Sequence, residues 1–580
     1  MPKPPARAHF VTRIRFVAIA IVFVACVILV RLYMLQVVHG AEYRALAEDQ
    51  YVRESPNQIE RGSIFMTKKD GSLISAATIA SGYTIAVNPL QIEDAAAAYA
   101  SVEPLLPDID KKTFIAKATK KNDSYEEITK QVADETGKAI SKLKIPGVEV
   151  LRERWRFYPG GTLAAHVVGF LGYGPDGKTV TGQYGLERYY NEALLRGEGG
   201  ISVNFFAELF TDISQQFFSK SAVPGADVVT SIEPSTQQFI ERMLDKYDST
   251  WHPKTSGAII MDPKTGAIVA MAARPAFDPN DFSQSSNADF VNPMVERVYE
   301  FGSIMKPLTM AAGIDAGAVT PETTYNDKGS ATFDQSKISN FDGKARGVVS
   351  MQEVLSQSLN TGVAFVVTRM GTGAFRDYFE KYGITDETGV DLPSEASALA
   401  DNFKSPRTIE YVTASFGQGI ALTPVAMTRA LATLANGGNV PAPHVGVELR
   451  YGGGITKTLG WSPERRAISE ESAEKVTKML VKVVDTALKH GQAKIPEYSI
   501  AAKTGTAQIA NPNGGGYYSD RYLHSFFGYF PAYNPKFIVF FFALEPKGAQ
   551  YASETWTDPF IETVHFLINY YDIPPDRASL

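Results

Sequence analysis

This sequence is typical of a multidomain α/β (α+β) protein that has one membrane-spanning helix, a mixed α+β region and a larger domain with a sheet covered by helices. The chain has 580 residues, more than one ordinary domain needs. A single long apolar run lies near the N-terminus, and in the C-terminal part strand-like segments flank a block of helical ones. Hydrophobic residues make up 44% of the chain and charged residues 21%, so it can bury large cores.

The apolar run at residues 14–38 predicts an uncleaved transmembrane anchor, because a spanning helix needs about 20 residues. Four basic residues, Lys3, Arg7, Arg13 and Arg15, precede its continuous apolar stretch from Phe16 to Val30. The positive-inside rule therefore places residues 1–13 in the cytoplasm and the rest on the periplasmic or extracytoplasmic face of the cytoplasmic membrane. A cleaved signal peptide is the alternative, but only a weak small-residue site stands near residues 38–40.

Composition argues against several classes of protein. The net charge is 57 − 63 = −6, without a basic stripe, so nucleic acid is not an expected partner. Cys26 is the one cysteine, which rules out an intrachain disulfide and a cysteine-rich zinc site. The eight histidines show no metal-ligand spacing. We therefore expect no metal and no cofactor.

Residues 39–224 are predicted to mix short strands with helices. Residues 83–87 alternate as in a strand, and a lysine-rich stretch around 110–145 reads as helical. Turn residues gather at 159–161 and 172–177. The chain shows no internal repeat, so a solenoid is not expected.

From residue 225 to about 575 the pattern predicts one domain. Helices are expected at 234–247, over most of 303–440 and at 558–571. The expected strands are 228–232, 257–261, 267–271, 499–506, 525–530 and 537–544. The order of strands, helices and strands predicts a sheet with helices on its faces.

Three short motifs in this region can carry chemistry. The first is Ser303-Ile304-Met305-Lys306, in which the spacing places the lysine beside the serine on one helical face. A neutral lysine could take the serine proton if burial and a nearby cation lowered its pKa. The second is Ser358-Leu359-Asn360, and the third is Lys503-Thr504-Gly505, at the end of an expected strand.

Each motif alone is weak evidence. A serine–x–x–lysine should occur about twice by chance in a chain of this composition, usually as a helix cap with a solvated lysine. The triplet Lys-Thr-Gly also occurs twice, and residues 264–266 are the copy that turn chemistry explains. Residues 503–505 instead follow a strand whose small residues would let an extended peptide approach.

Taken together, the three motifs in this order resemble those of penicillin-binding proteins and serine β-lactamases. Further segments resemble a transpeptidase domain, and others the non-catalytic, dimerisation-type pedestal of class B, monofunctional penicillin-binding proteins. The segments that resemble the transpeptidase domain are 256–271, 277–280, 416–424 and 435–438. The segments that resemble the pedestal are 61–64 and 182–200. Phe301 stands where the family usually has proline, and residues 66–69 stand where it has an aspartate–arginine pair.

The resemblance implies a peptidoglycan D,D-transpeptidase whose domains are a tail (1–13), an anchor (14–38), a pedestal (39–224) and a transpeptidase domain (225–575). Ser303 would attack the penultimate D-alanine of a peptide stem, with Lys306 as base. Ser358 would relay a proton, and Asn360 would hydrogen-bond the peptide amide. Lys503, Thr504 and Thr506 would bind the terminal carboxylate, with Gly505 also in the substrate site. The backbone N–H groups of Ser303 and Thr506 would form the oxyanion hole.

The implied partners are peptidoglycan stems, β-lactams, the membrane, and a SEDS-type glycan polymerase with division or elongation proteins. Asn360, in place of aspartate, favours a septal over an elongation role. A D,D-carboxypeptidase or a β-lactamase-like hydrolase would use the same serine, but the glutamate signature of a class A β-lactamase is missing from the sequence. A non-catalytic penicillin-binding scaffold would not need the full motif set.

Overall fold

The computed structural model describes residues 59–196 and 225–577, apart from 178, 284, 464 and 515, and scattered positions between 19 and 38. The predicted tail at 1–13 and most of the predicted anchor at 14–38 lie outside the described residues. Among the helices that are described, none is both long and apolar enough to cross a bilayer.

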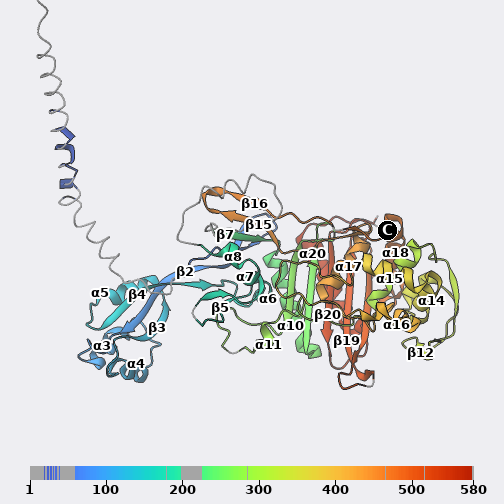
Figure 1. Ribbon diagram of the computed structural model, residues 1–580, viewed down its shortest axis with the longest axis horizontal. Coiled ribbons are helices and arrows are strands. Elements are labelled where there is room, and N and C mark those ends of the chain that lie inside the picture. The colour runs from blue at the N-terminus through green and yellow to red at the C-terminus, as the bar shows by residue number, and fades with distance from the viewer. Residues whose placement is uncertain are drawn as a thin grey trace, which may run out of the picture. The chain divides into compact units, whose positions relative to one another are not determined.

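The chain divides into two compact units, one of residues 1–59 and 79–155 and the other of residues 60–78 and 156–580. The first contains the second half of β2 (Leu73–Val87) and most of β4 (Val148–Phe157) (Figure 1). Its other elements are α3 (Ala95–Val102), α4 (Lys111–Ala118), β3 (Glu126–Val132) and α5 (Asp134–Lys142).

The strand predicted at 83–87 is confirmed within β2. The single helical stretch predicted around 110–145 is wrong in its middle, because 126–132 forms β3. That segment pairs antiparallel with β2, with Tyr83 opposite Val132. Pairing with a distant strand overrides the helical preference of its charged residues.

The second unit holds a small sheet and short helices in its N-terminal part. There β1 (Ile64–Thr67) runs antiparallel to β2 and parallel to β7 (Ala226–Thr230). β7 also pairs with β15 (Gly446–Tyr451), which pairs with β16 (Thr456–Thr458). The short elements are α6 (Ala165–Val168), β5 (Leu171–Tyr173), β6 (Val180–Gly182), α7 (Gly185–Tyr189) and α8 (Asn191–Leu194).

A buried ion cluster explains the role of Arg61 beside β1. Glu187 is fully buried and accepts from Nε of Arg61 and Nε of Arg156, each at 2.6 Å. Arg61 also donates to the Glu187 carbonyl, and Arg156 to the Gly62 carbonyl. The two oxygens of one carboxylate are thus shared between two arginines, and the contact with Arg61 ties the start of β1 to α7.

A five-stranded antiparallel sheet forms the centre of the second unit, in the order β18-β19-β20-β8-β9. Its strands are β8 (Thr255–Met261), β9 (Ile268–Arg274), β18 (Ala501–Ala510), β19 (Tyr517–Phe530) and β20 (Phe537–Leu544). These confirm the hairpin of β8 and β9 and the strands predicted at 257–261, 267–271, 499–506, 525–530 and 537–544. The strand predicted at 228–232 corresponds to β7, which ends at Thr230.

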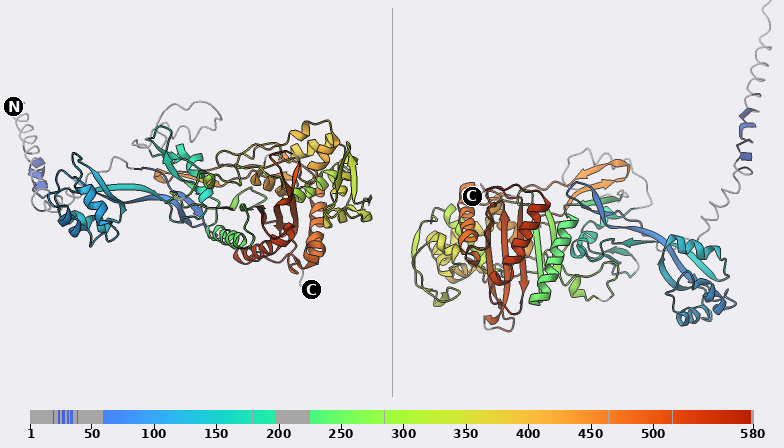
Figure 2. Two further views of the ribbon diagram at one scale, coloured as in Figure 1. Left: turned by 90° about the horizontal axis from the view of Figure 1, so that it is seen from below. Right: turned by 180° about the vertical axis from the view of Figure 1, so that it is seen from behind.

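Helices cover both faces of this sheet, because its strands are apolar on both sides. Ile260 and Phe541 point to one face, with α10 (Pro234–Trp251) and α20 (Thr557–Tyr570), which lie over the sheet in the right-hand view of Figure 2. Ile259 and Phe540 point to the other, toward α12 (Lys306–Asp315), α17 (Pro424–Ala435) and α18 (Glu470–Lys482). The predicted helices at 234–247 and 558–571 are confirmed.

The helical block predicted over 303–440 is interrupted by four strands. β10 (Thr324–Asp327) pairs with β13 (Gly347–Ser350), and between them β11 (Ser330–Phe333) pairs with β12 (Ser336–Ser339). Glycines with positive φ, Gly329, Gly343 and Gly347, break any helix here. The helices are α13 (Met351–Ser356), α14 (Asn360–Met370), α15 (Thr372–Lys381) and α16 (Thr408–Ala414), and the smaller elements elsewhere are α11 (Asn287–Phe290), β14 (Asn439–Val440), β17 (Arg465–Arg466) and α19 (Ala552–Thr555).

Candidate active site

Ser303 lies in a tight turn between the sheet and α12. A 3-10 helix, η2 (Gly302–Met305), leads directly into α12, whose first turn contains Pro307. Gly302 has a φ of +66°, and a Cβ there would lie 2.8 Å from the Thr506 carbonyl oxygen, so only glycine fits. Ser303 is half-buried, and its hydroxyl makes no hydrogen bond with any described residue. The hydroxyl is thus available to a substrate.

Lys306 follows one turn later and is completely buried. Its Nζ donates to the Ser358 carbonyl oxygen at 2.5 Å and to Ser358 Oγ at 3.1 Å. Burial, and secondarily the positive charge of Lys503, hold the pKa of Lys306 well below its usual value. The lowered pKa favours the neutral form of the amine, which can accept a proton.

Lys503 approaches the same hydroxyl from strand β18. Its Nζ donates to Ser358 Oγ at 3.0 Å and to the Thr504 carbonyl oxygen at 3.1 Å. Burial lowers the pKa of Lys503 to about 8. Ser358 itself has a φ of +54°, a conformation that is unfavourable for serine and is typical of functional sites. The structure therefore brings together one residue from each of the three predicted motifs.

Asn360 is the first residue of α14, two positions after Ser358. Its Nδ2 donates to the Ser339 carbonyl oxygen at 2.8 Å. Its Oδ1 has no partner among the described residues, so the carboxamide can still bind a ligand. The contact with Ser339 was not predicted, because Ser339 lies in β12, one of the four strands in the region that was predicted to be helical.

Strand β18 forms the edge of the five-stranded sheet beside η2. In the described part of the chain it pairs only with β19, Thr506 lying opposite His524. The Thr506 carbonyl faces Gly302. In a strand the N–H and C=O of one residue point to the same side, so the Thr506 N–H also faces the turn that carries Ser303. One backbone donor, the Thr506 N–H, is thus directed toward the turn that carries Ser303.

Two further residues help to fix this geometry, and only one was considered from the sequence. Ser525 is fully buried in β19, and its hydroxyl donates to the carbonyl oxygens of Phe301 at 2.7 Å and Gly505 at 3.3 Å. In the sequence, Ser525 stands directly before Phe526 and Phe527, and a lone hydroxyl beside two phenylalanines could have identified it as a residue with a structural role. Phe301, the departure from the family pattern, packs edge-on against Phe540 with ring centroids 5.3 Å apart.

Other polar residues that the sequence singled out lie elsewhere. Lys264 is exposed in the turn between β8 and β9 and donates to Asn534, so that Lys-Thr-Gly triplet is a turn. His524 is buried, with its ring nitrogens near Thr555 Oγ1 and the Gln550 carbonyl, and burial lowers its pKa to about 4.

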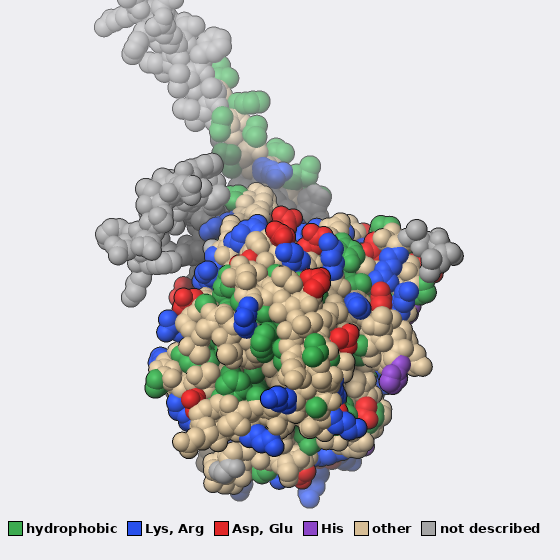
Figure 3. All heavy atoms as spheres, turned by 90° about the vertical axis from the view of Figure 1, so that its right-hand side faces the viewer, with side chains coloured by type: hydrophobic (Ala, Val, Ile, Leu, Met, Phe, Trp, Pro, Cys, Tyr) green, Lys and Arg blue, Asp and Glu red, His purple; other side chains and the backbone are tan. Residues whose placement is uncertain are grey.

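Basic and acidic side chains are interspersed over the face seen in Figure 3.

Comparisons with known proteins agree with this arrangement. Residues 256–563 match the family described as "Penicillin binding protein transpeptidase domain", and residues 56–230 match "Penicillin-binding Protein dimerisation domain". Stage V sporulation protein D of Bacillus subtilis is 30% identical over 563 residues, which cover 95% of this chain and 84% of that protein. Peptidoglycan D,D-transpeptidase FtsI of Escherichia coli is 26% identical over 460 residues, covering 78% and 73%.

Solved structures share the fold. Penicillin Binding Protein 2X from Streptococcus thermophilus superposes with a TM-score of 0.71 at 21% identity, covering 89% of this chain and 81% of that one. Penicillin binding protein 3 from Mycobacterium tuberculosis, without ligand, gives 0.64 at 26% identity, covering 73% and 92%.

Proposed function

Because the chain belongs to the penicillin-binding proteins, the family whose transpeptidase domain matches more than half of its length, we propose that it is a class B peptidoglycan D,D-transpeptidase with Ser303 as its nucleophile. The observation that carries the proposal is the convergence of Lys306 and Lys503 on Ser358 Oγ, beside a serine with a free hydroxyl and an open edge strand.

The first half-reaction forms an acyl-enzyme. Ser303 Oγ attacks the carbonyl carbon of the penultimate D-alanine, and its proton passes to neutral Lys306. The N–H groups of Ser303 and Thr506 stabilise the oxyanion. The C–N bond then breaks, and the proton moves from Lys306 through Ser358 Oγ to the amine of the departing D-alanine.

The second half-reaction transfers the acyl group. An amine from a neighbouring stem attacks the ester carbonyl and gives up its proton to Lys306. The C–O bond breaks, and the proton returns to Ser303 Oγ. In the first half-reaction Lys503, Thr504 and Thr506 would bind the terminal carboxylate of the donor, with Gly505 beside them in the substrate site. Asn360 would hold the peptide amide of the donor in both steps. β-Lactams imitate the donor and would acylate Ser303.

Covalent labelling with fluorescent penicillin tests this proposal. The full-length protein in detergent is incubated with the probe and run on a denaturing gel, beside Ser303→Ala and, as a matched control, the exposed serine variant Ser397→Ala. We expect a stable band in the wild type and in Ser397→Ala and none in Ser303→Ala. A folded wild-type protein that gives no band would favour a non-catalytic scaffold.

The fate of the acyl group separates a transpeptidase from a hydrolase. A transpeptidase should hold the penicilloyl group for much longer than one turnover and should join two stems when an acceptor amine is supplied. Rapid release of hydrolysed penicillin would instead identify a β-lactamase-like enzyme. Release of D-alanine without crosslinked product would identify a D,D-carboxypeptidase.

The location and partners are part of the same proposal. Residues 1–13 would be cytoplasmic, 14–38 the single anchor, 39–224 the pedestal and 225–575 the catalytic domain outside the membrane. Four basic residues before the apolar stretch that starts at Phe16 support this orientation. Asn360 favours septal wall synthesis, with a SEDS-type glycan polymerase as membrane partner. A fluorescent fusion that marks the side wall alone would indicate the elongation role.

A further inference from the structure

The strand insertion between α12 and α13 borders the active site. It comprises β10 to β13, residues 324–350, and was not predicted from the sequence. Its third strand, β12, ends at Ser339, whose carbonyl accepts the hydrogen bond from Asn360 Nδ2. The orientation of the Asn360 carboxamide is therefore fixed by a hydrogen bond to the insertion and not by α14, the helix that Asn360 begins.

The next residue, Asn340, caps the helix that begins at Asn360. Its Oδ1 accepts from the backbone N–H of Thr361 at 3.2 Å. The N-cap position of α14 is Leu359, whose side chain cannot supply such an acceptor. Asn340 is 3% exposed, so its carboxamide must form its hydrogen bonds within the protein and not with bulk water. It thus does the work of an N-cap from 21 residues away.

Asp327 in turn fixes the orientation of Asn340. Asn340 Nδ2 donates to both Asp327 oxygens, at 3.0 and 3.1 Å, which leaves Oδ1 directed at α14. The Thr361 hydroxyl donates to Asp327 at 2.8 Å, and the backbone N–H groups of Gly329 and Arg346 donate at 2.9 and 3.1 Å. Asp327 is 1% exposed, and these donors satisfy a carboxylate that is buried away from water.

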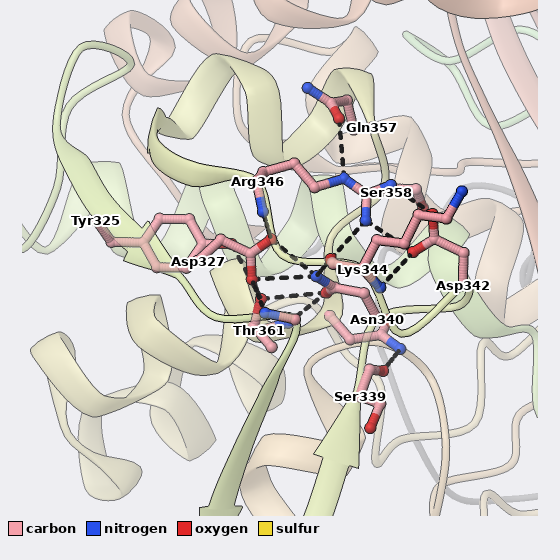
Figure 4. A network of polar contacts seen from close by, with 12 residues as sticks. Tyr325, Asp327, Ser339, Asn340, Asp342, Lys344, Arg346, Gln357, Ser358 and Thr361 are labelled. Carbon is pink, nitrogen blue, oxygen red and sulfur yellow. Dashed lines mark hydrogen bonds and ion pairs between the residues drawn. The ribbon is translucent and has the colours of Figure 1, made fainter.

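The network also reaches the residue before Ser358. Arg346 pairs with both oxygens of Asp342 and donates through Nε to Gln357 Oε1 at 3.2 Å (Figure 4). Figure 4 shows residues of the insertion hydrogen-bonded to Gln357 and Thr361, the two residues that flank the second motif. Both ends of the segment 357–361 are therefore held by side chains of the insertion.

We propose that Asp327, Asn340 and Thr361 are positioning residues that hold the Asn360 carboxamide in place for the amide of the donor peptide. The inference rests on the proposed function, since it needs a donor with an amide next to the reacting carbonyl. The three residues do not touch the substrate. They act by fixing the start of α14, so their loss should matter only for donors that use Asn360.

A pair of β-lactams separates positioning from general stability. Benzylpenicillin carries an acylamino side chain that Asn360 can bind, whereas 6-aminopenicillanic acid lacks the acyl group. We expect Asn340→Ala to slow acylation by benzylpenicillin about tenfold and to change acylation by 6-aminopenicillanic acid less than about twofold. Asn360→Ala should show the same selectivity, and the double variant should be no slower than the slower single one.

Controls make every outcome informative. Lys337→Ala, an exposed position on β12, should match the wild type with both compounds. If Asn340→Ala does not fold, Thr361→Val and Asp327→Asn test the same network, and Thr361→Ser should restore the rate. Equal slowing with both compounds, or additive effects with Asn360→Ala, would overturn the inference. A wild-type protein that is not acylated by either compound would instead overturn the proposed function.

Discussion

The side-chain nitrogen atoms of Lys306 and Lys503 lie 3.1 and 3.0 Å from one oxygen atom, Ser358 Oγ. Two ammonium groups this close and this buried cannot both stay protonated at low cost. The pKa of Lys306 falls further because it is buried and also feels the charge of Lys503. This difference favours the proposed roles, in which Lys306 acts as the base and Lys503 as the cation that binds the carboxylate.

Removal of the base should abolish most of the acylation. We expect Lys306→Ala to lower the rate of acylation by fluorescent penicillin by about 10²–10⁴-fold. Lys306→Arg should not restore it, because a guanidinium stays protonated and cannot accept the serine proton. Stopped-flow labelling measures the rate. A folded Lys306→Ala protein that acylates like the wild type would remove this lysine from the base role.

The rate of acylation should depend on pH in two opposite ways. It should rise with pH as Lys306 loses its proton, at a pH well below the usual lysine value because its pKa is lowered. It should fall as pH passes about 8, where Lys503 loses the charge that binds the carboxylate. The measurement is kcat/KM, or the acylation rate constant, across the pH range.

Lys503→Arg tests the assignment of the alkaline limb. Arginine stays charged to a pH above about 12, so the fall near pH 8 should disappear. Lys264→Ala, in the second Lys-Thr-Gly triplet, is the matched control and should keep the wild-type profile. A fall at the same pH in Lys503→Arg would assign that limb to another group.

The turn before the nucleophile should tolerate no side chain at Gly302. A Cβ there would meet the Thr506 carbonyl at 2.8 Å, so Gly302→Ala should displace Ser303 and slow acylation by more than about tenfold. Gly317 has nearly the same φ, +67° against +66°, but nothing within 4 Å of its Cβ position. Gly317→Ala should therefore cost about 1 kcal/mol of stability and leave the acylation rate unchanged. Equal acylation by both variants would contradict the steric argument.

The buried ion cluster should govern stability and not chemistry. Glu187→Ala leaves the guanidinium groups of Arg61 and Arg156 buried without their carboxylate, so unfolding should become easier by about 3–5 kcal/mol. Denaturant unfolding of the full-length protein measures this. Lys404→Ala, which breaks an ion pair with both partners over 80% exposed, should leave stability unchanged. A small effect of Glu187→Ala would mean that the arginines find other partners.

Local patterns account for the parts of the fold that were predicted. β20 was expected at Phe537–Leu544, with those bounds, because its apolar run is continuous and its neighbours are polar or turn-forming. The two Lys-Thr-Gly triplets were separated because Asp262, Pro263 and Gly266 mark a turn around Lys264, whereas Lys503 follows apolar residues. β3 was missed because its sequence alone favours a helix, and only pairing with β2 makes it a strand.

The sequence by itself determined the order of the three motifs, the strand under the third and the class of chemistry, because serine–x–x–lysine on a helix and a lysine after a strand are local features. Only the tertiary structure decided how they work together. Lys306 and Lys503 meet at Ser358, and Asn340 caps the helix of Asn360 across 21 residues of chain. Burial and hydrogen bonding between distant segments set the pKa of each lysine and the direction of each amide, and no sequence window contains that information.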